Sequence, residues 1–195
     1  MEKQGKYYER IGVTHMKVVA VMGSPRRDGK TNTLIREFLK GAKDAGHETY
    51  VYNVNELNIR GCQSCYTCKN SNCDCILQDD LKDYWKTLHE ADALIVGAPN
   101  YAGSICGPMV TYMNRHYCLL DKDWNVRIHP GIKLYGVFSQ GRENPEDYLN
   151  VYKWYLADFE NRKMLLQDIL VAGGKNALDP EGDLMKRAYR NGRGI

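Results

Sequence analysis

The chain has 195 residues, of which 43% are hydrophobic and 26% charged, a balance typical of a globular protein with one well-buried core. Its formal net charge is +3 and its basic residues are spread along the chain, so the composition does not indicate nucleic-acid binding. The N-terminus, MEKQGKYYER, is polar where a signal peptide is apolar, and no apolar run reaches the length of a membrane span. We therefore expect a cytoplasmic protein without nucleic-acid or membrane partners.

Short apolar runs alternate with segments of helical periodicity from residue 16 onward. The predicted strands are residues 17–23, 47–54, 93–99, 133–140 and 164–173. The predicted helices are residues 31–45, 81–88, 107–115, 145–162 and 180–190, with Asp79 and Asp80 placed to cap the second. Strands this apolar are covered on both faces, so the pattern predicts an α/β fold with a doubly wound, five-stranded parallel sheet in three layers. Residues 16–195 form the predicted single domain, and residues 1–15 precede it as an extension.

Four loops follow the carboxyl ends of the predicted strands, where ligands bind in sheets of this kind. They are residues 23–31, 55–78, 99–106 and 139–147.

The first of these loops, GSPRRDGKT, predicts a phosphate site. It joins a strand to a helix, and the N-terminus of a helix offers free N–H groups and a positive dipole end. Its further contributors are the side-chain donors Ser24, Thr31, Asn32 and Thr33 and the charge of Arg26. The loop has one residue more between its glycines than the GxxxxGK[ST] loop of nucleotide hydrolases, and no aspartate ends the strand at 93–99. The alternative is a plain strand-to-helix turn.

Five of the seven cysteines fall between Cys62 and Cys75, within the loop 61–78. Cys62, Cys65 and Cys68 are spaced as C-x2-C-x2-C, and a fourth thiol follows at Cys73 or Cys75. Such compact runs suit iron-sulfur clusters, whereas zinc sites more often use two separated pairs. Free thiols, zinc or a redox disulfide are the alternatives. Outside the loop, Cys106 and Cys118 are interpreted as small buried side chains.

Three segments resemble one known family. GSPRRDGKTNTL, GCQSCYTCKNSNCDCILQDDL and GAPNYAGSICGPMVTYMNR follow the first three predicted strands, and together they resemble the NADPH-dependent FMN reductase family of flavodoxin-like proteins, in particular its iron-sulfur flavoprotein branch. The resemblance covers roughly residues 16 to 173. It implies a flavodoxin-like fold, noncovalently bound FMN and a homodimer or homotetramer.

The resemblance also assigns site residues by position. Ser24, Arg26, Thr31, Asn32 and Thr33 correspond to the FMN phosphate site, in which Lys30 replaces a frequent asparagine. Pro99, Asn100, Tyr101, Gly103 and Ser104 correspond to the segment along the isoalloxazine ring, and Ser139 and Gly141 to a third loop near it. For Tyr101, packing on the core is the alternative. The branch holds a [4Fe-4S] cluster, and its pattern assigns Cys62, Cys65, Cys68 and Cys75 as ligands, with Cys73 as the alternate fourth.

The leading hypothesis is a flavin-dependent oxidoreductase in which FMN and a [4Fe-4S] cluster pass electrons from NAD(P)H or ferredoxin, with no side chain needed as acid or base. A cluster-free NAD(P)H-dependent FMN or quinone reductase is the first alternative. A non-enzymatic redox carrier or sensor is the second.

The remaining polar residues give weaker indications. The histidines His47, His89, His116 and His129 are interpreted as surface or capping residues. Arg115 is assigned to packing or a subunit contact. Tyr148, Tyr152 and Tyr155 share one helical face and are assigned to the core or an oligomer interface, with a substrate platform as the alternative.

Overall fold

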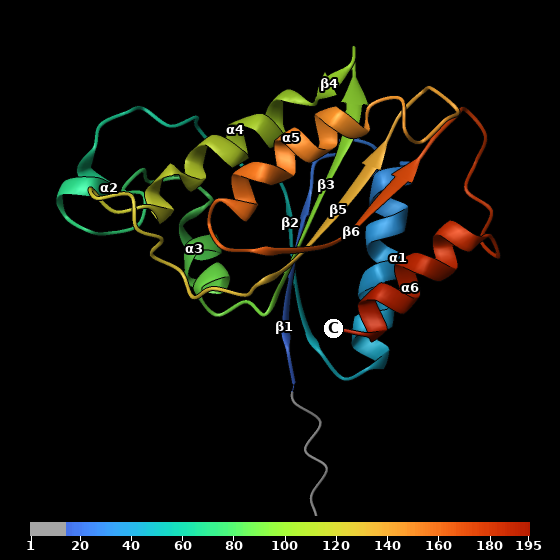
Figure 1. The fold of residues 1–195 in the computed structure, drawn as a ribbon, viewed down its shortest axis with the longest axis horizontal. Helices are drawn as coiled ribbons and strands as arrows, with labels where there is room; N and C mark the ends of the chain where they lie inside the picture. Colours follow the sequence, from blue (N-terminus) through green and yellow to red (C-terminus); the bar gives the residue numbers. More distant parts are fainter. Residues whose placement is uncertain (1–14) are drawn as a thin grey trace, which may run out of the picture.

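The computed structural model describes residues 15–195, in which a twisted parallel sheet lies between two layers of helices (Figure 1). Within these residues the parallel strands are β1 (Lys17–Met22), β2 (Glu48–Asn53), β3 (Ala93–Tyr101), β5 (Lys133–Ser139) and β6 (Leu165–Ala172), in the order β2-β1-β3-β5-β6. The predicted doubly wound, five-stranded, three-layer sheet is confirmed. The predicted extension lies outside the described residues except for its last residue, His15.

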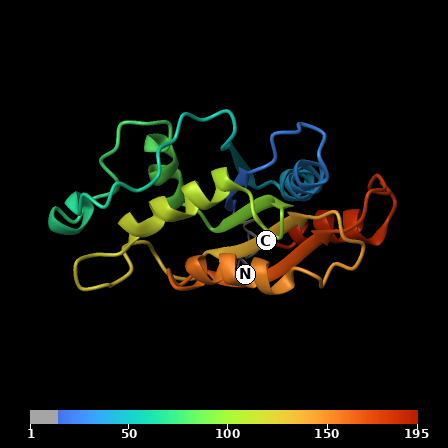
Figure 2. The same ribbon diagram turned by 90° about the horizontal axis from the view of Figure 1, so that it is seen from above.

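The helices divide between the two faces of the sheet (Figure 2). One face is covered by α1 (Lys30–Asp44) and α6 (Asp183–Arg193), and the other by α3 (Lys82–His89), α4 (Gly107–Arg115) and α5 (Leu149–Glu160). A short helix, α2 (Thr67–Asn70), and a 3-10 turn, η1 (His116–Leu119), complete the described helical elements. None of the helices within residues 15–195 combines the length and apolar character that crossing a bilayer requires.

The burial of β1 explains why its sequence is a continuous apolar run. Val18, Val19, Ala20 and Val21 are all 0% exposed, because helices cover both faces of this central strand. β2 pairs with β1 alone and lies at the edge of the sheet, where Val51 is half exposed. The strand order reverses between β1 and β3. The loops after these two strands therefore run to opposite faces of the sheet, and a crevice that can bind a ligand forms between them.

The end of β3 differs from the prediction of a strand that stops at residue 99. The strand continues to Tyr101 and turns back into β4 (Ser104–Ile105), which pairs with it antiparallel. Ala102 and Gly103 form the turn with φ of 51° and 80°, the positive values that a two-residue hairpin requires. The segment predicted to contact a ligand is therefore a hydrogen-bonded hairpin and not an irregular loop.

The predicted capping of the second helix is observed for one of the two carboxylates. Asp79 Oδ1 accepts the backbone N–H of Leu81, just before α3, at 3.2 Å. Asp80 accepts the backbone N–H of Asn58 at 2.6 Å, and Asp79 forms an ion pair with Arg115. Asp79 also accepts the backbone N–H of Arg60 at 3.2 Å, so both carboxylates connect the segment before the cysteine loop 61–78 to the segment after it.

Candidate functional site

A cavity of about 330 Å³ lies at the carboxyl ends of the strands, and we call it the strand-end cavity. Its walls come from the loops after β1, β5 and β6 and from the last residues of β3 and β5. They include the predicted residues Ser24, Arg26, Pro99, Asn100, Tyr101, Ser139 and Gly141, together with Gly29, Lys30, Gln140, Gly174 and Lys175. Residues at the carboxyl ends of four parallel strands therefore meet at one place, as the parallel topology requires.

The loop after β1 is shaped to receive an anion. It folds tightly on Gly29, where an added Cβ would lie 2.8 Å from Ser24 Oγ. The first turn of α1 carries no acidic side chain, and no side-chain cap occupies its N–H groups among the described residues. These free donors and the helix dipole face the same cavity as Arg26, so the arrangement suits a phosphate group.

Two of the residues predicted to hold the phosphate lie beneath the loop. Thr31 Oγ1 is 2.8 Å from Ser139 Oγ, which ties the start of α1 to the end of β5. Asn32 Nδ2 donates to the carbonyl oxygens of Ser24 at 3.2 Å and Arg26 at 3.1 Å. Both side chains are buried and hold the loop in shape instead of lining the cavity.

Thr33 is the predicted phosphate residue that the structure places farthest from this role. Its hydroxyl accepts a hydrogen bond from Arg36 at 3.3 Å, and it lies outside the lining of the strand-end cavity.

The hairpin after β3 contributes a free donor. Asn100 Oδ1 accepts the N–H of Gly103 at 3.0 Å, while Asn100 Nδ2 is buried with no hydrogen-bond partner among the described residues. Since Asn100 lines the cavity, this amide is available to a carbonyl or ring nitrogen of a bound molecule. Tyr101 is 50% exposed, so its alternative assignment to the core is not supported.

A neighbouring cavity of about 420 Å³ adjoins the first through Asn100 and Gly141. Gly103 and Tyr148 lie in its wall, and Ser104 lies outside the lining of both cavities. Tyr152 and Tyr155 are fully buried, in agreement with their assignment to the core, while Tyr148 is only partly buried.

The loop after β6 is the part of the cavity that the sequence did not predict. Lys30 Nζ donates to the carbonyl oxygens of Gly174 at 2.6 Å and Gly173 at 3.3 Å, and Lys175 lines the cavity beside them. Gln140, also missed, is held by the hydroxyl of Tyr152 at 2.7 Å. The segment Gly173-Gly174-Lys175 directly follows a parallel strand. Its position at the carboxyl end of that strand could have indicated that it lines the cavity.

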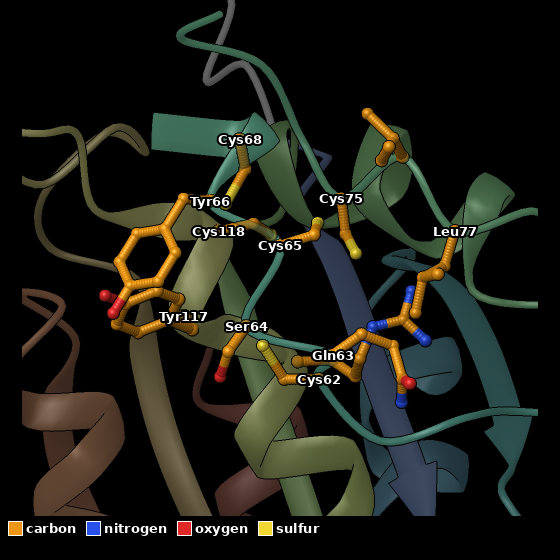
Figure 3. A pocket seen from close by; sticks show the side chains of 12 residues that line it. Cys62, Gln63, Ser64, Cys65, Tyr66, Cys68, Cys75, Leu77, Tyr117 and Cys118 are labelled. Atoms are coloured by element: carbon orange, nitrogen blue, oxygen red, sulfur yellow. The ribbon is translucent and has the colours of Figure 1, made fainter. Parts of the chain in front are cut away.

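A third cavity, the cysteine cavity, lies between the loop 61–78 and residues 115–118 (Figure 3). Cys62, Cys65, Cys68 and Cys75, the predicted ligands, line it together with Cys118. Cys73 lies outside this lining, and its Sγ is 4.0 Å from the carbonyl oxygen of Thr67. Cys118 is 2% exposed, as expected of a small buried side chain, yet it faces the same space.

The space between these thiols is small. It measures about 10 Å³, and within residues 15–195 no three cysteine, histidine or carboxylate side chains converge closely enough to hold one metal ion. The donor set nevertheless suits an iron-sulfur cluster. Each iron atom of a [4Fe-4S] cluster binds one thiolate, and because the cluster is larger than a single metal ion, its four thiolates need not converge as closely.

The backbone of the cysteine loop is strained around the thiols. Ser64, Tyr66 and Asn72 have φ of 49°, 56° and 47°, in the left-handed region that residues other than glycine rarely adopt. Arg127 links this loop to the 3-10 turn η1. It donates to the carbonyl oxygens of Cys73 at 2.6 Å and Asn72 at 2.9 Å in the loop, and to that of Cys118 in η1 at 2.7 Å.

The thiols differ in how readily they ionise. Hydrogen bonds from the backbone and hydroxyl of Thr67 lower the pKa of Cys65. Burial raises the pKa of Cys68, and raises that of Cys118 to about 12. The exposed thiol of Cys65 is therefore converted to the thiolate that binds metal more easily than the buried thiols of Cys68 and Cys118.

Burial distinguishes the roles of Arg115 and His116, which lie next to this cavity. Arg115 is 1% exposed, which supports its assignment to packing over a subunit contact; it lines the cysteine cavity and forms a buried ion pair with Asp79. The assignment of His116 is corrected. His116 is 0% exposed instead of lying at the surface, and its Nε2 is 2.9 Å from the hydroxyl of Tyr84. Their burial depends on packing between α3, α4 and α5, which the sequence pattern does not reveal.

Helix α4 runs between the two cavities. At its N-terminal end, Cys106 Sγ donates to the carbonyl oxygen of Gly23, next to the phosphate loop, at 3.4 Å. At its other end, Arg115 enters the wall of the cysteine cavity. Figure 1 shows the helix extending from β4 toward α2.

Comparison with known proteins identifies related sequences. The family model of the NADPH-dependent FMN reductases matches residues 16–151. An iron-sulfur flavoprotein of Methanocaldococcus jannaschii is 34% identical over 100 residues, which is 51% of each chain. A second from the same organism is 32% identical over 131 residues, or 66% of each chain. One from Methanosarcina thermophila is 24% identical, covering 71% of this chain and 72% of the relative. The match thus spans about half of the first relative's length.

Solved structures share the fold. An NAD(P)H:quinone oxidoreductase from Methanothermobacter marburgensis has a TM-score of 0.70 at 20% identity, covering 93% of this chain and 96% of that one. An archaeal flavodoxin has a TM-score of 0.57 at 13% identity, covering 92% and 96%. Because its family model matches well over half of its length, the chain belongs to the NADPH-dependent FMN reductase family, and its relatives named above are iron-sulfur flavoproteins.

Proposed function

We propose that this chain is an FMN-dependent oxidoreductase that relays electrons through a [4Fe-4S] cluster. The observation that carries the proposal is the presence of two distinct sites on one domain-sized fold. One is a strand-end cavity below a phosphate-type loop, and the other is a cavity faced by four thiols of a compact cysteine run. NAD(P)H or ferredoxin is the proposed electron donor.

The strand-end cavity suits FMN in its charge and its hydrogen-bond donors. Arg26, the Ser24 hydroxyl and the first turn of α1 would hold the phosphate, since each presents a donor or positive charge at one end of the cavity. The unpartnered Asn100 amide would donate to the flavin ring. When bound, FMN accepts two electrons as hydride and releases them one at a time. The protein's part is to bind and orient it.

The cysteine cavity suits a cluster in its donor set. Cys62, Cys65, Cys68 and Cys75 would be the ligands, and the position of Cys73 outside the lining supports Cys75 as the fourth. A space of about 10 Å³ accommodates about one water molecule, so binding a cluster requires the loop to open outward. The exposure of Cys65 leaves one side of the loop free to do so.

The same small space favours a second candidate. If the thiols remain free, the chain is a cluster-free reductase that moves hydride from NAD(P)H to FMN and on to a quinone or other acceptor. The fold is shared with an NAD(P)H:quinone oxidoreductase, which is compatible with either candidate.

The test is an absorption spectrum of the protein purified anaerobically, with assays of iron and inorganic sulfide. We expect flavin bands, a broad cluster band and about four iron atoms per chain. Flavin bands without iron would overturn the cluster and favour the second candidate. A colourless protein that does not take up FMN would overturn the whole proposal.

Single cysteine variants then test the ligand set. Cys75→Ala is expected to lose the iron while retaining FMN, and Cys73→Ala is the matched control that retains both. The reverse result would assign Cys73 as the fourth ligand. Steady-state assays distinguish the donor: rapid reduction by ferredoxin with slow NAD(P)H turnover supports a relay, whereas a protein with no turnover is a carrier or sensor.

Two further parts of the proposal concern assembly and location. We propose a homodimer or homotetramer, which sedimentation of the FMN-loaded protein tests, and a monomer would contradict it. We propose a reducing cytoplasmic location, because seven cysteines are all free in the structure.

A further inference from the structure

Arg115 has a hydrogen-bonding pattern that its ion pair does not fully explain. Nη1 donates to the carbonyl oxygen of Arg60 at 2.8 Å and to Asp79, and Nη2 donates to Asp79 at 3.3 Å. Nε is buried with no partner among the described residues. The side chain is fully buried, and the residue lines the cysteine cavity next to the predicted ligand Cys75.

An unused N–H in such a place is unusual, because buried donors almost always find an acceptor. The other donors of this guanidinium fix its position, so Nε cannot turn to solvent without breaking the ion pair. Burial lowers the pKa of Arg115, but the hydrogen bond to Asp79 contributes to a net rise, so the guanidinium stays charged. Arg115 and Cys75 both line the cysteine cavity of about 10 Å³, which places the guanidinium beside the space that the Cys75 thiol faces.

We propose that Arg115 is a positioning residue for the [4Fe-4S] cluster, and that its guanidinium donates a hydrogen bond to the sulfur of Cys75 and thereby raises the cluster's reduction potential. This inference rests on the proposed function, since it needs a cluster in the cysteine cavity. Hydrogen bonds to cluster sulfurs and nearby charge are among the factors that set such potentials.

The direction of the effect follows from the charges. Reduction adds one negative charge to the cluster, and a donor N–H stabilises the more negative state more strongly. Asp79 opposes this effect because its carboxylate neutralises part of the guanidinium's charge. Removing the donor is therefore expected to lower the potential, and removing the carboxylate is expected to raise it.

The experiment is a potentiometric titration of the anaerobically purified holoprotein, followed by electron paramagnetic resonance of the reduced cluster. Arg115→Lys preserves the charge that pairs with Asp79 but lacks the planar set of donors. We expect iron, sulfide and FMN contents equal to those of the wild type. The ratio of reduced to oxidised cluster at a fixed potential is expected to fall at least tenfold, which corresponds to a shift of about 59 mV for a one-electron couple.

Arg127→Lys is the matched control. It is the same substitution in another arginine that contacts the cysteine loop, but the guanidinium of Arg127 donates to three backbone carbonyl oxygens, so we expect no shift. Asp79→Asn is the second variant, and its potential is expected to move upward.

The outcomes separate the two proposals. A wild-type protein without iron or sulfide overturns the proposed function itself. A wild-type cluster whose potential does not change in Arg115→Lys overturns the role of the arginine alone. Loss of the cluster in both Arg115→Lys and Asp79→Asn, with FMN retained, also overturns it, because the pair would then serve only to hold the loop. Equal shifts in Arg115→Lys and Arg127→Lys would show a general effect of loop loosening and refute the hydrogen bond.

Discussion

Gly173 does not line the strand-end cavity, but replacing it by alanine is expected to disturb that cavity. Gly173 lies where the loop after β6 crosses the loop after β5, and an added Cβ would be 2.3 Å from the carbonyl oxygen of Glu143 and 2.8 Å from that of Arg142. Ordinary contact begins at 3.4 Å, so the two loops must separate by about 1 Å.

That separation breaks two hydrogen bonds at Gly174. Its N–H donates to the carbonyl oxygen of Arg142 at 2.7 Å, and its carbonyl oxygen accepts from Lys30 at 2.6 Å. A neutral bond contributes about 1 kcal/mol and one to a charged group somewhat more, so the free energy of unfolding should fall by about 2–3 kcal/mol. For a protein of this length, the melting temperature should fall by about 4–12 °C.

The measurement is thermal unfolding of the FMN-free protein by circular dichroism, with FMN affinity from flavin fluorescence. Gly173→Ala is expected to melt earlier and to bind FMN more weakly, because Lys30 and the loop after β6 lose their mutual anchor. Gly107→Ala is the matched control: no atom of the described residues lies within 4 Å of its added Cβ, so stability should be unchanged or slightly higher. Equal melting temperatures for Gly173→Ala and the wild type would refute the close contact between the two loops.

Two further predictions concern the buried polar side chains. Burial holds the pKa of His116 in the folded protein well below that of a histidine in the unfolded chain, which is about 6.5. The unfolded chain therefore binds a proton first as the pH falls, so the free energy of unfolding is unaffected by His116 above pH 6.5 and decreases below it. Between pH 7 and 5.5, urea unfolding should show a loss about 1 kcal/mol smaller in His116→Phe than in the wild type; identical losses would contradict the assignment. Tyr152→Phe leaves Gln140 Oε1 without its 2.7 Å donor and is expected to cost about 1–3 kcal/mol, which chemical denaturation measures. An unchanged midpoint would show that Gln140 finds another partner.

Much of the fold was predictable from the sequence because its central strands are continuous apolar runs. β1 needed no tertiary information, since four consecutive residues are buried on both faces. The phosphate loop and the cysteine loop were likewise predictable from local spacing. Each of these two features depends on residues within one short segment. The parallel topology then places both loops at the carboxyl ends of the strands.

The unpredicted features depend on contacts between distant segments. Lys30 bonds to a carbonyl 144 positions away, and nothing near either residue indicates the pairing. The burial of His116 arises from Tyr84 and Phe159, which come from two other helices. The hairpin after β3 depends on Ala102 adopting a positive φ, which its residue type disfavours.

Helix α4 also acts as a spacer of fixed length. A helix of nine residues rises about 13 Å, so the distance between the ends of the two cavities is set by backbone hydrogen bonds and not by the conformations of mobile loops. Met109 and Tyr112 on this helix are fully buried, so the side of the helix that faces the core consists of packed side chains. An electron passing between cofactors bound at the two ends would tunnel through packed side chains, and its rate would be insensitive to solvent viscosity.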